Sequence, residues 1–170
     1  TTAIAKALSG RDEAGELLEL LYRRHLFTDR RPGAEPVYQF HALFRNFLQM
    51  HLRQRLDPRE VRRLKVRSAD ILEANGYVEA AFGLRVDAKV WKEAVDTILE
   101  AASELLTSGR RQTLISWIEA LPSSHLTAQP RLLYWLGMAQ AQTAPMRGIE
   151  SFRQALPLCR RANDVQGTVL

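Results

Sequence analysis

Residues 38–48 read YQFHALFRNFL, and the hydrophobic period changes in the middle of this stretch. Before His41, residues 36–40 form a short β-prone run, whereas the apolar residues after it recur at helical spacing. A second β-prone run lies at residues 26–29, and RRPGAE at residues 30–35 separates the two with a Pro and a Gly that suit a turn. The pattern therefore predicts a β-hairpin over residues 26–40 and a helix that begins next to His41.

Two further helices are predicted, one before this segment and one after it. The run DEAGELLELLYRRHLF has helical spacing from Asp12, which is placed to act as the N-cap. After HALFRNFLQMHLRQRL, Asp57 and Pro58 form an N-cap followed by a proline at the first helical position. Asn75 and Gly76 then predict a left-handed end to that helix. One helix therefore precedes the hairpin, and two follow it before residue 77.

From Tyr77 onward the sequence predicts short helices in series. The amphipathic units VEAAFGL, WKEAVDTILEAASELL, TLISWIEAL, PRLLYWLGMAQAQ and IESFRQALPLC are separated by VDA, SGR, PSSHLTAQ and TAPM. A small-x3-bulky-x2-Ala spacing occurs twice, at residues 94–101 and 148–155, and Leu136-Gly137 places a glycine where two helices can approach closely. These features are typical of antiparallel helical hairpins of the tetratricopeptide kind. We predict a mainly α fold with one hairpin and a helical-hairpin solenoid.

Composition and charge limit the cellular locations and the binding partners to be expected. The 170 residues contain one cysteine, no signal-peptide pattern and no apolar run of membrane-spanning length, so a reducing, cytoplasmic location is expected. The chain begins at Thr1 rather than Met, which favours a segment of a longer protein. Residues 1–70 hold 14 basic and 9 acidic side chains, an excess of five, whereas residues 71–170 hold 10 of each. A basic surface of this kind meets nucleic acid or another acidic surface, or is simply the solvated face of a helix.

Taken together, LYRRHLF, YQFHALFRNFL, the Arg-rich helix, RRQTLISWIEALP and QPRLLYWLGMA resemble one known family. They are similar to the region after the nucleotide-binding domain in bacterial signal-transduction ATPases with numerous domains (STAND), specifically the LuxR-type regulators related to the maltose-system activator. The resemblance implies a partial winged-helix domain at residues 1–56, a linking helix at 57–76 and a tetratricopeptide-like sensor region at 77–170. It also implies that a separate C-terminal helix-turn-helix would bind DNA in the complete protein.

The resemblance implies a role for His41 as well. In the wider family a winged-helix histidine, within a hydrophobic-His-Asp-hydrophobic motif, contacts the phosphates of ADP and holds the resting state. Phe40-His41-Ala42-Leu43 matches this motif except that Ala42 replaces the aspartate. The chemistry is compatible, because a histidine in the first turn of a helix presents a donor where the helix amides already favour an anion. The alternative is a polar residue that ends a strand and binds a nearby carbonyl.

The sequence gives no support for catalysis by this chain. It contains no G-x-x-x-x-G-K-[ST] loop, so ATP or ADP would be a cofactor only of a longer protein that supplies a nucleotide-binding domain. The four histidines and Cys159 lack metal-ligand spacing, and no nucleophile and base form a recognisable set. We therefore expect no enzyme activity, no metal and no bound cofactor.

Partner binding is expected in the repeat region. The first-helix positions of the repeat would place four side chains on the concave side: Arg131, Tyr134, Met138 and Gln142. The aromatic residues Trp91, Trp117, Tyr134 and Trp135 either line such a groove or fill the seams between hairpins. The expected partners are the nucleotide-binding domain of the same protein, an unidentified inducer or regulatory protein, and other copies of the complete protein. Two alternatives remain: direct DNA binding by a winged helix within the first 70 residues, and a free-standing repeat scaffold.

Overall fold

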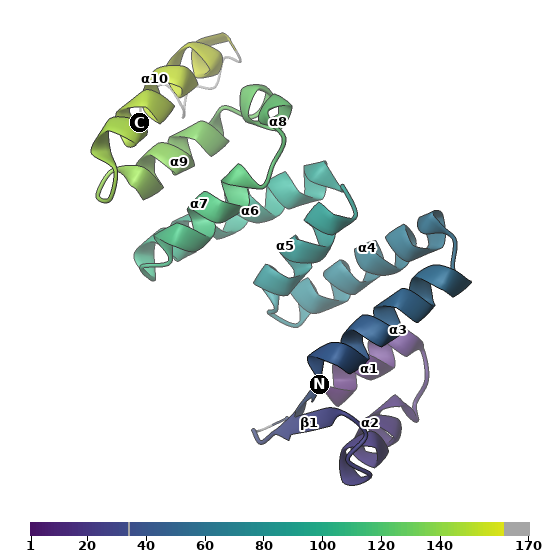
Figure 1. Ribbon diagram of the computed structural model, residues 1–170. Coiled ribbons are helices and arrows are strands. Elements are labelled where there is room, and N and C mark those ends of the chain that lie inside the picture. The colour runs from purple at the N-terminus through teal and green to yellow at the C-terminus, as the bar shows by residue number, and fades with distance from the viewer. Residues whose placement is uncertain (34, 162–170) are drawn as a thin grey trace. The chain divides into compact units, whose positions relative to one another are not determined.

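The computed structural model describes residues 1–33 and 35–161, which form ten helices and one two-stranded sheet (Figure 1). The chain divides into two compact units, of which the first spans Thr1–Leu84 and the second begins at Arg85. Helices thus dominate, and the described strands lie within the predicted residues 26–40. The predicted fold class, mainly α with one short hairpin, is confirmed.

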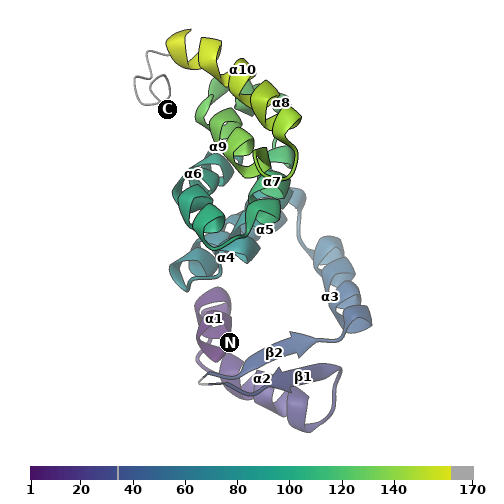
Figure 2. The ribbon, with the colours of Figure 1, turned by 90° about the vertical axis from the view of Figure 1, so that its left-hand side faces the viewer.

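The first unit contains the hairpin and the helices that surround it in sequence. Its elements in chain order are α1 (Thr2–Ser9), α2 (Ala14–Arg23), β1 (Thr28–Arg31), β2 (Val37–Phe40), α3 (Ala42–Arg55), α4 (Pro58–Ala74) and the start of α5 (Val78–Asp87). The strands are antiparallel, with Thr28 opposite Phe40 and Arg31 opposite Val37. Helix α1 packs against both α2 and α4, and α3 leaves the hairpin at the end of β2 (Figure 2).

The start of the chain corrects the sequence prediction. Helix α1 was not predicted, yet Thr1 caps it by accepting the amide N–H of Ile4 at 3.4 Å, and Gly10 ends it in the left-handed conformation at φ 68°. Asp12 is not the N-cap of the next helix; that position belongs to Glu13, whose side chain makes no capping hydrogen bond. The carboxylate of Asp12 lies 3.7 Å from the Lys6 ammonium instead, which draws it away from the amides of α2.

The start of α4 follows the prediction closely. The Asp57 carboxylate accepts the amide N–H groups of Arg59 at 2.7 Å and Glu60 at 2.9 Å, and the Glu60 carboxylate accepts the Asp57 N–H at 3.1 Å. This is a complete capping box with Pro58 at the first helical position. The helix ends at Asn75, and Gly76 follows at φ 81°. Both predicted ends of this helix are confirmed.

The second unit is built from successive helices and holds most of the described core. It comprises the end of α5, then α6 (Trp91–Thr107), α7 (Arg111–Glu119), α8 (Ser123–Ala128), α9 (Arg131–Gln140) and α10 (Pro145–Arg161). Helix α9 packs against α6, α7, α8 and α10. The largest fully buried side chains are Ile98, Leu114, Ile118, Leu132 and Cys159. PSSHLTAQ was predicted as a connecting loop, but Ser123 to Ala128 form α8, because the Pro122 carbonyl accepts the His125 N–H at 2.9 Å and starts a turn.

Helices α9 and α10 lie side by side (Figure 1), and two glycines lie at their contact. A Cβ on Gly137 would lie 2.7–2.9 Å from three ring atoms of Phe152, and a Cβ on Gly148 would lie 3.0 Å from the Gly137 carbonyl oxygen. Real Cβ atoms rarely approach other heavy atoms this closely, so the two helices pack through their glycines. Beside them the Ser151 hydroxyl donates to Gln140 Oε1 at 3.2 Å, both side chains being buried. The predicted close approach at Leu136-Gly137 is confirmed.

The boundary between the two compact units differs from the predicted domain boundaries. The division between units falls within α5, after Leu84, whereas the sequence analysis placed limits after residues 56 and 76. Division by compactness and division by evolutionary module are different criteria, so the boundaries 1–56, 57–76 and 77–170 stay a proposal about modules.

Candidate functional site

One face of α3 is apolar and largely uncovered in the first unit. Its side chains are 52–74% exposed, and Leu43 is the most exposed of them. We call this surface the α3 apolar face; its members are Leu43, Phe47 and Met50, whereas the exposed Leu48 and Leu52 lie on another side of the helix. An exposed contiguous apolar surface on a folded domain marks an interaction site, because each large side chain left in water forgoes about 1.5–3 kcal/mol of burial free energy.

Aromatic contacts fix the beginning of α3 against the hairpin. The ring of Phe44 lies 5.8 Å from Phe27 and 5.5 Å from Phe40, the second pair in an edge-to-face arrangement. Along the helix, Phe47 stacks at 6.4 Å on Phe44 and at 5.8 Å on His51. The rings therefore form a continuous series from the hairpin onto the α3 apolar face, and they hold the start of the helix in a defined direction.

Phe27 is itself unusual. Its backbone has φ 50°, a left-handed conformation that is uncommon for a bulky aromatic residue, and its side chain is 63% exposed. Its carbonyl oxygen accepts the backbone N–H of His41 at 2.8 Å. Strained backbone is concentrated at functional sites in proteins, and here it adjoins the predicted sensor residue.

His41 is the N-cap residue of α3 rather than a member of its first turn. Its backbone is extended at φ −54° and ψ 145°, and its carbonyl accepts the Arg45 N–H at 2.9 Å. The prediction of a first-turn position is therefore off by one residue, because the extended ψ of His41 lies outside the helical range. The imidazole makes no capping hydrogen bond, and the residue is exposed. The beginning of α3 thus presents a histidine and uncapped helix amides together.

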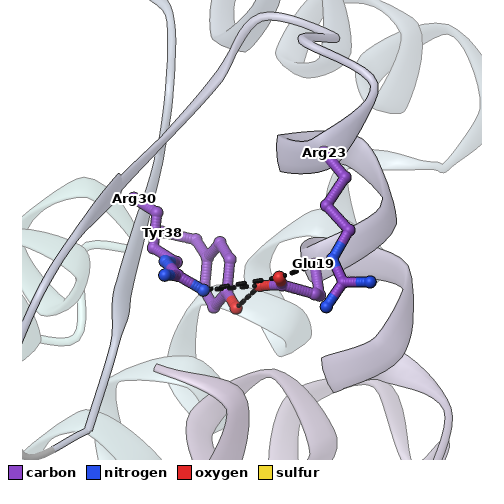
Figure 3. A network of polar contacts seen from close by, with 4 residues as sticks. All are labelled: Glu19, Arg23, Arg30 and Tyr38. Carbon is purple, nitrogen blue, oxygen red and sulfur yellow. Dashed lines mark hydrogen bonds and ion pairs between the residues drawn. The ribbon is translucent and has the colours of Figure 1, made fainter.

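A polar network fastens the hairpin to α2 (Figure 3). The Glu19 carboxylate accepts hydrogen bonds from the Tyr38 hydroxyl at 2.6 Å, Arg23 Nε at 2.9 Å and Arg30 Nη1 at 3.1 Å. The bond from Tyr38, followed by those from Arg23 and Arg30, lowers the pKa of Glu19 to about 2. The guanidinium of Arg30 also lies 4.9 Å from the centre of the Tyr22 ring.

Sequence reasoning did not find this network, because the partners of Glu19 lie up to 19 residues away in the chain. The turn of the hairpin has a second attachment: Glu35 Oε1 accepts the Ala3 N–H at 3.0 Å and the Thr2 hydroxyl at 3.2 Å. Both attachments are made by glutamates, and together they hold the hairpin against α1 and α2. These two attachments of the hairpin therefore fix the direction in which α3 leaves it.

The four predicted partner-binding residues lie near one another in the second unit but do not all belong to α9. Arg131 and Met138 are exposed and Tyr134 is half-buried on this helix, whereas Gln142 is exposed just beyond its end. Tyr134 contacts Trp135 at 5.3 Å within α9 and Phe152 of α10 at 5.9 Å.

The remaining tryptophans of the second unit take different positions. Trp117 is buried, and the half-buried Trp91 lies 6.0 Å from His125. Seam filling therefore accounts for Trp117, and for Tyr134 against Phe152.

The described residues contain no candidate metal site and no candidate membrane span. No group of three His, Cys, Asp or Glu side chains there is placed to hold a metal ion. No helix over the same residues combines the length and the apolar character that crossing a bilayer requires.

In comparison with known proteins, the hairpin and its surrounding helices match a winged helix domain family. The matching family is the MalT winged helix domain, and the match covers residues 1–61. The matched segment contains α1 to α3 and the hairpin, and its similarity to this family is the one that the sequence resemblance predicted.

Similarity to curated proteins extends further along the chain. The chain is 27% identical over 157 residues to the serine/threonine-protein kinase PknK of two Mycobacterium tuberculosis strains (CDC 1551 / Oshkosh and H37Rv) and of Mycobacterium bovis. The aligned region covers 90% of this chain but only 14% of each relative. No solved structure matches the chain.

Proposed function

We propose that the chain is a non-catalytic regulatory and interaction module of a bacterial, LuxR-type STAND transcription regulator. In this proposal it couples an ATP-binding domain of the same cytoplasmic protein to a helical-repeat sensor. The supporting observation is the uncovered α3 apolar face on a segment that matches the MalT winged helix domain. A winged helix domain that carries its large apolar side chains outside is suited to dock on another domain.

The occupant of the α3 apolar face, in this proposal, is the nucleotide-binding domain of the complete protein. The similarity to much longer proteins, of which the aligned region covers 14%, supports an intramolecular partner. Burial of Phe47 and Leu43 alone would contribute about 3–6 kcal/mol, which is enough to hold a domain interface that opens during signalling. The ATPase activity itself would belong to that other domain.

His41 is proposed to contact a phosphate of ADP across this interface. The position supports the role because an exposed imidazole and uncapped helix amides both donate toward an anion. A charge-assisted hydrogen bond of this kind contributes about 1.5–3 kcal/mol, which corresponds to roughly a tenfold to hundredfold shift of a two-state switch. The missing aspartate at Ala42 removes a brace of the family motif but leaves the histidine itself in place.

The first test is His41→Ala in the full-length regulator, with His125→Ala in the second unit as the matched control. The proposal expects ADP to dissociate roughly tenfold to a hundredfold faster from the His41 variant, with higher inducer-independent transcription, and no such change in the control. Melting curves of the isolated chain should be alike for wild type and His41→Ala, because the imidazole makes no capping bond. An unchanged ADP dissociation rate would exclude the sensing role.

The second test addresses the docking surface without a mutation. Amide hydrogen exchange is measured over residues 42–55 in the isolated chain and in the full-length regulator. The proposal expects slower exchange in the full-length protein, because a covering domain suppresses local opening of the helix. Equal exchange rates in both would show that α3 is not a docking element.

The repeat region is proposed to receive the signal. Arg131, Tyr134, Met138 and Gln142 are the candidate contacts for an inducer or a regulatory protein, and they combine charge, an aromatic ring and a flexible thioether. In this scheme DNA is bound by a separate C-terminal helix-turn-helix, and the complete protein self-associates when active.

A further inference from the structure

The positive charge of the chain is concentrated on α3 and α4. Residues 42–74, which span both helices, hold eight basic and four acidic side chains, an excess of four, whereas the net charge of the whole chain is +5. Five of the eight basic residues belong to α4 (Pro58–Ala74). A basic helix surface of this kind is either solvated or meets an anionic partner, and the arrangement of its side chains bears on which.

The arginines of α4 share one side of the helix. Arg59, Arg62, Arg63 and Arg67 line a surface hollow of about 620 Å³, together with Val66 and Asp70. We call this surface the α4 arginine face. At a rise of about 1.5 Å per residue, its charges extend over about 12 Å of helix. The side chains of Arg59 and Arg63 form no hydrogen bond or ion pair within residues 1–33 and 35–161, whereas Arg67 donates to the Ala7 carbonyl at 3.1 Å.

The chemistry of the α4 arginine face is that of a phosphate-binding surface. All four cations are guanidinium groups, whose planar donor pairs match phosphate oxygens better than a lysine ammonium does. Val66 is the one apolar residue that lines the hollow. The core of a protein–protein interface is apolar and depleted of charge, whereas protein–nucleic acid interfaces are polar and strongly positive. The composition therefore favours nucleic acid over an acidic protein.

The helix that precedes the hairpin, where a winged helix usually reads DNA, is unsuited to that task here. Helix α2 begins after Glu13 and contains Glu16 and Glu19, which place negative charge on its surface and its start. A contact with phosphates would therefore use another element, and α4 carries five basic side chains, more than any other described helix.

We propose that the α4 arginine face binds the phosphate backbone of nucleic acid without reading its sequence. This binding is separate from the domain coupling proposed above, since it uses α4 rather than the α3 apolar face or His41. With four phosphate contacts, the logarithm of the binding constant should fall against the logarithm of the salt concentration with a slope of about −3.6. The affinity for duplex DNA should therefore fall about 150-fold between about 50 and 200 mM salt.

The test measures binding of the 170-residue chain to a labelled duplex of about 20 base pairs by fluorescence anisotropy at several salt concentrations. The test variant is Arg59→Gln with Arg63→Gln, because these side chains have no partner within the described residues. The control is Arg11→Gln with Arg147→Gln, two exposed arginines outside α4 that remove the same charge. A third variant, Arg59→Lys with Arg63→Lys, keeps the charge and checks that the helix is intact.

The proposal expects the test variant to lose two phosphate contacts, so that its affinity for the duplex falls only about 12-fold over the same salt range. The control and the lysine variant should keep a salt dependence near that of the wild type. Equal losses in the test variant and the control would show attraction by net charge alone and overturn the proposal. Failure of the wild type to bind the duplex at low salt would also overturn it. Displacement of the duplex by polyglutamate at equal charge concentration would assign the surface to an acidic protein instead.

Discussion

The contact between Gly137 and Phe152 allows a quantitative test of how the second unit is packed. Replacing Gly137 with alanine places a Cβ 2.7–2.9 Å from three atoms of the Phe152 ring, where ordinary contacts begin at about 3.4 Å. Overpacking of this kind costs about 1–3 kcal/mol, and the better helix propensity of alanine returns about 1 kcal/mol. We expect Gly137→Ala to lower the free energy of unfolding by about 1 kcal/mol.

The measurement is urea unfolding followed by tryptophan fluorescence and by far-ultraviolet circular dichroism. All three tryptophans, Trp91, Trp117 and Trp135, lie in the second unit, so fluorescence reports on the unit that carries the mutation. In thermal unfolding, 1 kcal/mol corresponds to a lowering of Tm by about 2–4 °C for a chain of this size.

A matched control separates the steric effect from helix propensity. Gly83 also lies within a helix, but a Cβ there would meet no atom within 4 Å; it belongs to the first unit, so its effect is followed by circular dichroism. Gly83→Ala should therefore raise stability by up to about 1 kcal/mol. The double variant Gly137→Ala with Phe152→Leu should recover part of the loss, because it removes the ring that clashes. If Gly137→Ala is as stabilising as Gly83→Ala, α9 and α10 are not in contact through this glycine.

Two further predictions concern the first unit. Glu19 has a pKa lowered from 4.5 to about 2 by its bonds to Tyr38, Arg23 and Arg30, so the stability it contributes is present above about pH 4.5 and is lost as the pH falls toward 2. Glu19→Gln should therefore reduce the pH dependence of Tm in that range, and an unchanged profile would contradict the network. Asp57→Ala should destabilise the chain by about 0.5–2 kcal/mol through loss of the capping box, as measured by chemical denaturation, whereas Asp57→Asn should cost much less.

Local signals in the sequence predicted the elements that local chemistry determines. Asp57 and Pro58 specify a helix start through atoms within three residues, and Asn75-Gly76 specifies its end in the same way. The alternation before His41 and the helical spacing after it likewise located the junction to within one residue. Helix α1 was not predicted, because its eight residues are too few to show a clear hydrophobic period. Thr1 and Gly10 are nevertheless ordinary signals for the start and the end of a helix.

The features that involve distant residues could not be predicted in the same way. No local pattern pairs Glu19 with Tyr38. The left-handed backbone of Phe27 could not be predicted either, because phenylalanine rarely adopts this conformation. The amphipathic pattern of α3 indicated an apolar face, but only the structure shows that the first unit leaves this face uncovered. For the second unit, spacing predicted the Gly137 contact because neighbouring helices in the chain are also neighbours in space.

The pairing of α1 with α4 has a consequence for biosynthesis. The bond from Arg67 to the Ala7 carbonyl joins residues 60 positions apart, so α1 emerges from the ribosome well before its partner does. At about 5–20 residues per second, this leaves an interval of roughly 3–12 s during which α1 lacks its packing against α4. The second unit has no comparable delay between α9 and α10, which follow one another directly. Chaperones that hold nascent chains would therefore engage the first unit described here rather than the second.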